Sequence, residues 1–87
     1  MKKKETFILR TIGGSNVMMP VGATALKFNG LITANDSAAF VWKNIEKVSS
    51  AEELAQLLCQ EFDVSHEKAL ADCQNIIDEM IKAGWIE

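Results

Sequence analysis

The residues that could carry out chemistry in this chain of 87 residues are few and scattered. Covalent catalysis needs a nucleophile beside a base, and a structural metal site needs about four ligands close together. His66 is the only histidine, and it directly follows the capping residue Ser65, so we expect it to be solvated at the start of a helix. The serines fall at turns or helix caps, which accounts for them without a nucleophilic role: Ser15, Ser37, Ser49, Ser50 and Ser65.

The cysteines and paired carboxylates also fall short of a catalytic or metal site. Cys59 and Cys73 are far apart in the sequence and stand among apolar neighbours, which predicts two buried thiols rather than a disulfide or a metal pair. Neighbouring carboxylates, as in Glu52-Glu53, point about 100° apart on a helix and cannot share a proton. We therefore expect a protein that is not an enzyme and holds neither a metal ion nor an organic cofactor.

The composition is that of one small globular domain, residues 1–87. Apolar residues make up 48% of the chain and charged residues 24%. No apolar run approaches the ~20 residues of a membrane span, and Glu5, Thr6 and Arg10 interrupt any signal-peptide core. We expect a cytoplasmic protein without a membrane partner, in which the lysines of residues 2–4 form a frayed end.

Alternating apolar residues predict an antiparallel sheet of three short strands, and a fourth strand is an alternative that the sequence leaves undecided. Residues 7–12 and 17–21 alternate on either side of a glycine-containing turn and should form a hairpin. Residues 31–34 read as a further strand, directly after an Asn-Gly pair that favours a turn. Residues 25–28 either pair with that strand across the turn or form an ordered loop.

Three helices follow, and each has a capping residue at its start. Asn35, Asp36 and Ser37 offer N-cap oxygens to the first helix, and Ser65 caps the third. Ser50 opens the second helix as a capping box with the glutamate three positions later. A glycine is expected to end the third helix, after which the Trp-Ile pair at 85–86 folds back on the core.

The third helix carries a wider apolar arc, about 140°, than contacts with two helices require. The flank that suffices for those contacts consists of Leu70, Ile77 and Ile81. The surplus flank consists of Ala69, Ile76 and Met80, with Asp72 at its polar border. This surplus flank either packs against the sheet or lines a groove.

The charge distribution argues against nucleic acid as a partner. A hairpin with three helices also describes a winged helix, whose third helix would enter the major groove of DNA. Residues 1–47 carry seven basic and three acidic groups, a net +4, whereas residues 48–87 carry two basic and nine acidic groups, a net −7. A helical half this acidic repels phosphates, so a DNA-binding regulator is the less favoured alternative.

The order and spacing of these segments resemble the pyrroloquinoline quinone biosynthesis protein D (PqqD) family over nearly the whole chain. The matching blocks are Phe28-Asn-Gly-Leu-Ile-Thr-Ala-Asn-Asp-Ser-Ala-Ala-Phe-Val-Trp42, Ala51-Glu-Glu-Leu54, Phe62-Asp-Val64, Asp72-Cys73, Ile76-Ile77 and Gly84-Trp85-Ile86. Ala34 and Trp85 stand where Leu is usual in the family, and Cys73 stands where Val is usual. The resemblance implies an α+β, winged-helix-like domain that binds the leader of a ribosomally made precursor peptide. It also implies a partner enzyme, either a radical S-adenosylmethionine enzyme or another modifying enzyme.

The expected mechanism is strand addition. A leader peptide pairs its backbone with the exposed edge of strand 31–34, and alternate side chains enter a groove beside the third helix. The resemblance, through Asp72, selects the flank of that helix that faces the groove. The expected peptide-binding residues are Leu31, Ile32, Thr33, Ala34, Ala69, Asp72, Cys73, Ile76 and Met80.

The same strand edge offers a second hypothesis. Exposed edges pair readily with another copy of the chain, so a homodimer, and with it a purely structural role, is the competing interpretation.

Overall fold

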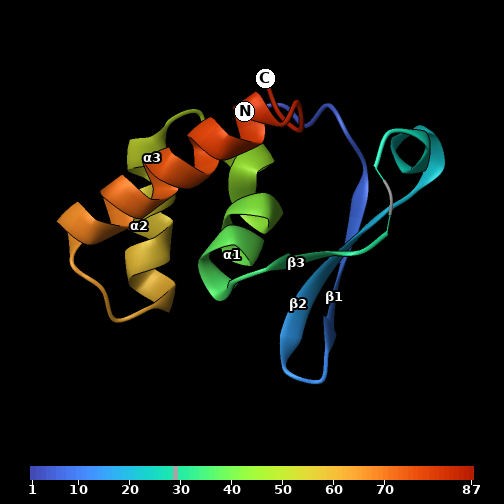
Figure 1. Ribbon diagram of the computed structural model, residues 1–87. Helices are drawn as coiled ribbons and strands as arrows, with labels where there is room; N and C mark the ends of the chain where they lie inside the picture. Colours follow the sequence, from blue (N-terminus) through green and yellow to red (C-terminus); the bar gives the residue numbers. More distant parts are fainter. Residues whose placement is uncertain (29) are drawn as a thin grey trace.

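The structure, a computed structural model, describes residues 1–28 and 30–87 as a three-stranded antiparallel sheet followed by three helices (Figure 1). The strands are β1 (Phe7–Ile12), β2 (Ser15–Pro20) and β3 (Ile32–Ala34), in the sheet order β1-β2-β3. The helices are α1 (Asp36–Asn44), α2 (Ala51–Glu61) and α3 (His66–Lys82). Two 3-10 turns, η1 (Gly22–Leu26) and η2 (Ile45–Lys47), follow β2 and α1. The predicted α+β architecture is confirmed. No helix in the described part of the chain is long and apolar enough to span a membrane.

Two glycines close the β1–β2 hairpin. Gly13 and Gly14 have φ values of 56° and 81°, which suits a two-residue turn of type I′, where both central residues need positive φ. Because the turn takes only these two residues, β2 begins at Ser15, two residues earlier than predicted. The strands then pair in register from Phe7 opposite Pro20 to Ile12 opposite Ser15.

Strand β3 lies at an edge of the sheet. It pairs with β2 from Asn16 opposite Ala34 to Met18 opposite Ile32. No other described strand pairs with β3, so its second edge is free. Leu31, predicted to open the strand, lies just before it and is 59% exposed.

The connection from β2 to β3 contains η1 rather than a fourth strand, so the predicted alternative of strand pairing by residues 25–28 is wrong. In the predicted Asn-Gly turn, Gly30 has a φ of 74°, and Asn29 lies outside the described residues.

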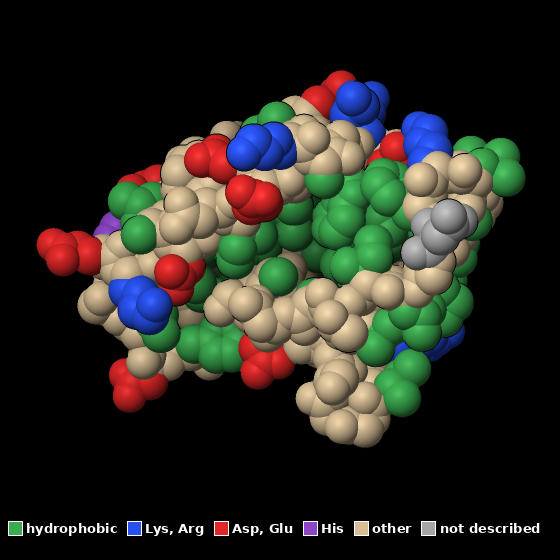
Figure 2. All heavy atoms as spheres, viewed as in Figure 1, with side chains coloured by type: hydrophobic (Ala, Val, Ile, Leu, Met, Phe, Trp, Pro, Cys, Tyr) green, Lys and Arg blue, Asp and Glu red, His purple; other side chains and the backbone are tan. Residues whose placement is uncertain are grey.

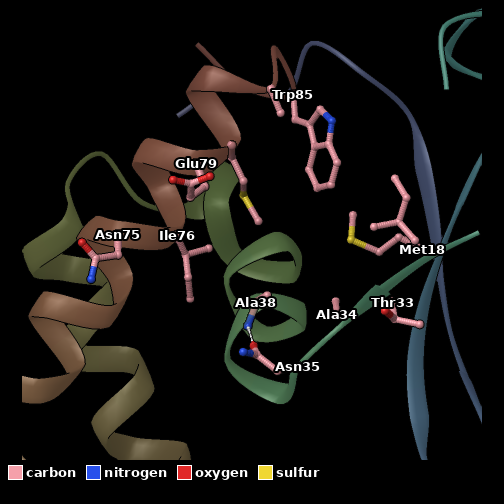
Figure 3. Close-up of a pocket in the computed structure, with 12 residues that line it drawn as sticks. Met18, Thr33, Ala34, Asn35, Ala38, Asn75, Ile76, Glu79 and Trp85 are labelled. Atoms are coloured by element: carbon pink, nitrogen blue, oxygen red, sulfur yellow. Dashed lines mark hydrogen bonds between the residues drawn. The ribbon is translucent and has the colours of Figure 1, made fainter.

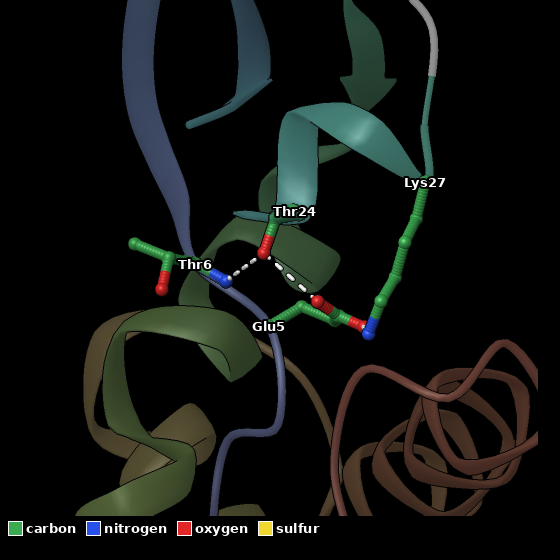
Figure 4. A network of polar contacts seen from close by, with 4 residues as sticks. All are labelled: Glu5, Thr6, Thr24 and Lys27. Atoms are coloured by element: carbon green, nitrogen blue, oxygen red, sulfur yellow. Dashed lines mark hydrogen bonds and ion pairs between the residues drawn. The ribbon is translucent and has the colours of Figure 1, made fainter. Parts of the chain in front are cut away.

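A polar network holds η1 against the start of β1 (Figure 4). Thr24 is 3% exposed; its Oγ1 accepts a hydrogen bond from the Thr6 N–H at 2.7 Å and donates one to the Glu5 carboxylate at 2.9 Å. The Lys27 ammonium lies 2.9 Å from the same carboxylate. The hydrogen bonds from Lys27 and then from Thr24 lower the pKa of Glu5 below its ordinary value of 4.5. The network fixes the connection that delivers the chain to β3.

Replacing Thr24 with Val, which has nearly the same shape, is expected to destabilise the fold by about 1–3 kcal/mol. The substitution leaves the Thr6 N–H without its partner in a partly buried place. Urea unfolding followed by circular dichroism would measure the loss. As a control, Lys27→Met removes a side chain that is 61% exposed and should cost less. An unchanged midpoint for Thr24→Val would contradict a structural role for the network.

The lowered pKa of Glu5 makes its contribution to stability depend on pH. Since the folded-state pKa lies below the unfolded value, the carboxylate stabilises the fold above pH 4.5 and loses this effect as pH falls through the folded pKa. A Glu5→Gln variant should therefore be less stable than wild type at neutral pH, and the gap should narrow below pH 4.5. Unfolding midpoints of both proteins across this range test the sign, and a gap that widens on acidification would contradict it.

The side chains predicted to cap the three helices do so, but one predicted hydrogen bond of the second helix is replaced by another. The Asn35 and Ser65 side chains accept the N–H groups of the residues three positions later, as predicted. Ser50 accepts the Glu53 N–H at 3.2 Å, but the Glu53 carboxylate accepts a hydrogen bond from Ser49 Oγ at 2.7 Å. The reciprocal half of the predicted capping box is thus replaced by a contact with the preceding serine.

The helices lie to one side of the sheet, with α1 next to β3 and α2 packed against α3, and they share a core with the sheet (Figure 1). Phe7 and Met18 contribute to this core from the sheet, whereas Ile8 and Ile12 on the opposite face are exposed. The apolar side of α1 is buried at Val41 and Trp42, and the burial continues at Ile45 in η2 and at Val48 after it.

The two ends of the chain lie side by side (Figure 1). The Lys4 N–H donates to the Trp85 carbonyl at 2.8 Å, and the Glu87 N–H donates to the Lys2 carbonyl at 2.9 Å. The Lys3 ammonium lies 4.4 Å from the centre of the Trp42 ring. The prediction that residues 2–4 form a frayed end is wrong, because the folded-back C-terminal residues provide a backbone partner for them.

Candidate functional site

A groove with a volume of about 430 Å³ opens between β3 and α3. The space-filling view shows it as a hollow with hydrophobic walls between the helices and the strands (Figure 2). Its lining is mainly apolar, with three polar residues from loop and helix surfaces and one threonine from β3. The residues are Met18, Ile32, Thr33, Ala34, Asn35, Ala38, Asn75, Ile76, Glu79, Met80, Ala83 and Trp85.

Strand β3 forms one wall. Side chains alternate along a strand, and accordingly Ile32 and Ala34 pack against the core while Thr33 is exposed. The free edge of β3 therefore borders the groove with unpaired backbone groups beside an apolar surface.

Helix α3 forms the opposite wall. Ile76 projects toward the groove, with Asn75 and Glu79 beside it on the outer side (Figure 3). Met80, one helical turn further along, also lines the groove. The helix thus presents two apolar side chains flanked by one amide and one carboxylate.

The end of α3 positions a third wall. Gly84 has a φ of 80°, its N–H donates to the Ile81 carbonyl, and the Trp85 N–H donates to the Met80 carbonyl, which together form a Schellman motif. This turn directs Trp85 toward the groove (Figure 3), where its ring also packs on Phe7 with centroids 4.7 Å apart. The wall is therefore fixed by backbone geometry and aromatic packing together.

The sequence model of the family described as "Coenzyme PQQ synthesis protein D (PqqD)" matches residues 7–86. The chain belongs to the PqqD family. Among curated proteins, none matches it. The solved structure "TbiB1 in Complex with the TbiA(beta) Leader Peptide" matches with a TM-score of 0.69 and 15% identity, over 100% of this chain and 95% of that chain. At this identity the structural match shows a shared fold.

Five of the nine residues that the sequence assigned to the site of this PqqD-family protein line the groove: Ile32, Thr33, Ala34, Ile76 and Met80. Leu31 is exposed and lies outside the lining. Asp72 also lies outside it, and its carboxylate is 3.2 Å from the Lys68 ammonium one turn earlier.

Ala69 and Cys73 lie in the core with 0% exposure. The buried stripe of α3 runs through Ala69, Cys73, Ile77 and Met80, so the division of the apolar arc drawn from the sequence is wrong. Ile81, placed by that division against the other helices, is 50% exposed.

Sequence reasoning missed the other seven lining residues: Met18, Asn35, Ala38, Asn75, Glu79, Ala83 and Trp85. Met18 reaches the groove only through its register opposite Ile32, which the sequence does not specify. Trp85 could have been found, because a glycine that ends a helix fixes the direction of the next residue.

The described residues contain no group of three His, Cys, Asp or Glu side chains able to hold a metal ion. His66 lies 3.2 Å from the Glu52 carboxylate, and neither residue lines the groove. Burial, followed by the charge of Asp72, raises the pKa of the Cys73 thiol, which favours its unreactive protonated form. A free strand edge beside an apolar groove is instead suited to hold an extended peptide.

Proposed function

We propose that this PqqD-family protein binds the leader segment of a ribosomally synthesised precursor peptide by strand addition at β3. The observation that carries the proposal is the free edge of β3, which opens directly onto the apolar groove beside α3. The matched structure supports it, since that structure is of TbiB1 in complex with a leader peptide.

The dimensions of the groove suit an added strand. Two residues of a strand span about 6.7 Å, and one turn of helix between Ile76 and Met80 spans about 6 Å. Two successive inward-facing side chains of a bound peptide can therefore each meet one apolar side chain of α3.

Because β3 is short, backbone hydrogen bonds to it can supply only part of the binding free energy of a peptide. Three residues of β3 offer roughly two to four hydrogen bonds, each worth about 1 kcal/mol. One or two apolar anchors in the groove, at about 2 kcal/mol each, supply most of the remaining affinity. We expect dissociation constants in the micromolar range or tighter.

We further propose that the protein is a non-catalytic peptide chaperone, and that the chemistry occurs on a modifying enzyme to which it presents the peptide. Within the described chain, Glu79 is the one ionisable side chain in the groove lining, and no nucleophile stands beside it. A radical S-adenosylmethionine enzyme is the partner that the family resemblance favours.

Calorimetric titration of the purified protein against leader peptides encoded near its gene tests the proposal. Saturable 1:1 binding is expected for one of these peptides and not for its scrambled version. Equal binding of leader and scrambled peptides, or no binding at several hundred micromolar, would contradict it.

A second copy of the chain is the rival occupant of the β3 edge, favoured by the exposed Leu31 beside it. Sedimentation velocity separates the two interpretations. If the leader peptide and a second copy of the chain compete for the β3 edge, adding the leader peptide should convert any dimer to monomer.

A further inference from the structure

The two ends of the groove differ in size and charge. Near the start of α1, Ala34 and Ala38 present only methyl groups opposite Ile76 (Figure 3), which leaves room for a large side chain. At the other end, Met80 and Trp85 form an apolar wall, and Glu79 stands on the α3 side.

Glu79 differs from the neighbouring acids of α3. Asp72 pairs with Lys68, and Asp78 accepts a hydrogen bond from Gln74 at 2.9 Å. Among the described residues, Glu79 has no ion pair within 4.0 Å, although Lys82 lies on the next turn. Its carboxylate is thus available to a cation that enters the groove.

From these observations we infer that the leader places a Lys or Arg side chain at the Met80–Trp85 end of the groove, facing Glu79. We infer also that a large apolar side chain lies two residues away, over Ala34 and Ala38. The inference rests on the proposed function. A long cationic side chain suits this end because its aliphatic stem packs on apolar surface while its charged head reaches a carboxylate. An acidic side chain there would meet the charge of Glu79.

The spacing of two residues follows from the geometry of the wall. Ile76 stands opposite the two alanines, and Met80 stands one turn, about 6 Å, further along α3. Consecutive inward-facing residues of a strand are about 6.7 Å apart, so they occupy these two levels in turn.

General attraction by the acidic helical half must be separated from recognition at Glu79. Residues 48–87 carry a net −7, and this charge attracts any basic peptide. Glu79→Lys and Asp78→Lys change the net charge equally, but only Glu79 lines the groove. Asp78→Lys is therefore the matched control.

Selection of displayed random decapeptides against wild type, Glu79→Lys and Asp78→Lys tests the inference. We expect wild type and Asp78→Lys to enrich one motif, with Lys or Arg two positions from a large apolar residue. Glu79→Lys should enrich peptides in which Asp, Glu or an uncharged residue replaces the basic one. A shared motif for all three proteins, or a wild-type motif without the basic position, would overturn the inference and leave the proposed function standing. If no protein enriches any peptide, the proposed function fails, and the inference fails with it.

A double-mutant cycle with the selected peptide supplies the second readout. Replacing its basic residue with norleucine should weaken binding to wild type about three- to tenfold, and binding to Glu79→Gln less than twofold. Equal weakening on both proteins would show that the basic residue does not contact Glu79, and would overturn the inference.

Discussion

An Ile76→Asp substitution is expected to weaken leader binding by about 2 kcal/mol or more, close to 30-fold. Ile76 is half-buried and lines the groove on α3. The substitution places a charged carboxylate where an apolar side chain of the peptide docks, and the desolvation of that charge opposes binding. Titration with a leader peptide that binds wild type measures the effect.

The control for this variant is Ile81→Asp, which makes the same chemical change on the same helix. Ile81 is half-exposed and lies outside the groove lining, so binding should be unchanged. Thermal melting of both variants must show that they are folded. A folded Ile76→Asp protein that binds the leader as tightly as wild type would remove the groove from the binding site.

An Ala38→Phe substitution should reduce leader binding more than tenfold, because the ring fills the groove from α1 and displaces an apolar anchor worth about 2 kcal/mol. Ala38 lies in the first turn of α1 rather than on β3, and it lines the groove (Figure 3). The substitution therefore separates binding in the groove from pairing at the strand edge.

Ala71→Phe is the matched control for Ala38→Phe. Ala71 is an exposed helical alanine outside the groove, so this variant shares the change in helix propensity but should retain full affinity. Undiminished binding by Ala38→Phe would indicate that the peptide uses the strand edge alone.

Local rules were enough to predict most elements of the fold. The hairpin follows from alternating residues around two glycines, which adopt the positive φ values that its turn requires. The helix starts follow from Asn35, Ser50 and Ser65, because a capping side chain satisfies backbone groups within three residues of itself. These signals need no knowledge of the rest of the chain.

The flanks of α3 could not be divided correctly from sequence. A stripe 140° wide identifies apolar positions but not which neighbour each position meets. Ile76 reaches the groove because β3 lies across from it, whereas Ala69 and Cys73 join the core, in a helix that packs against α2 and α1. These are tertiary contacts, for which the helix itself carries no signal.

The connection before β3 shows a second reason why the sequence did not predict the whole fold. Residues 25–28 have the apolar content of a strand, but the buried hydroxyl of Thr24 accepts from Thr6 and donates to Glu5, and the segment turns as η1. A side chain that bonds to a segment about 18 residues away overrides the local preference.

The most direct test of strand addition is amide hydrogen exchange at β3, measured residue by residue by NMR with and without a saturating leader peptide. Pairing of the peptide with the free edge of β3 must bury outward-pointing N–H groups, so exchange should slow at one or more of Ile32, Thr33 and Ala34. Exchange rates of the amides on the outer strand β1 should not change, except for a uniform slowing if the bound peptide raises the global stability of the fold. A saturated complex in which the β3 amides exchange as in the free protein would contradict the account.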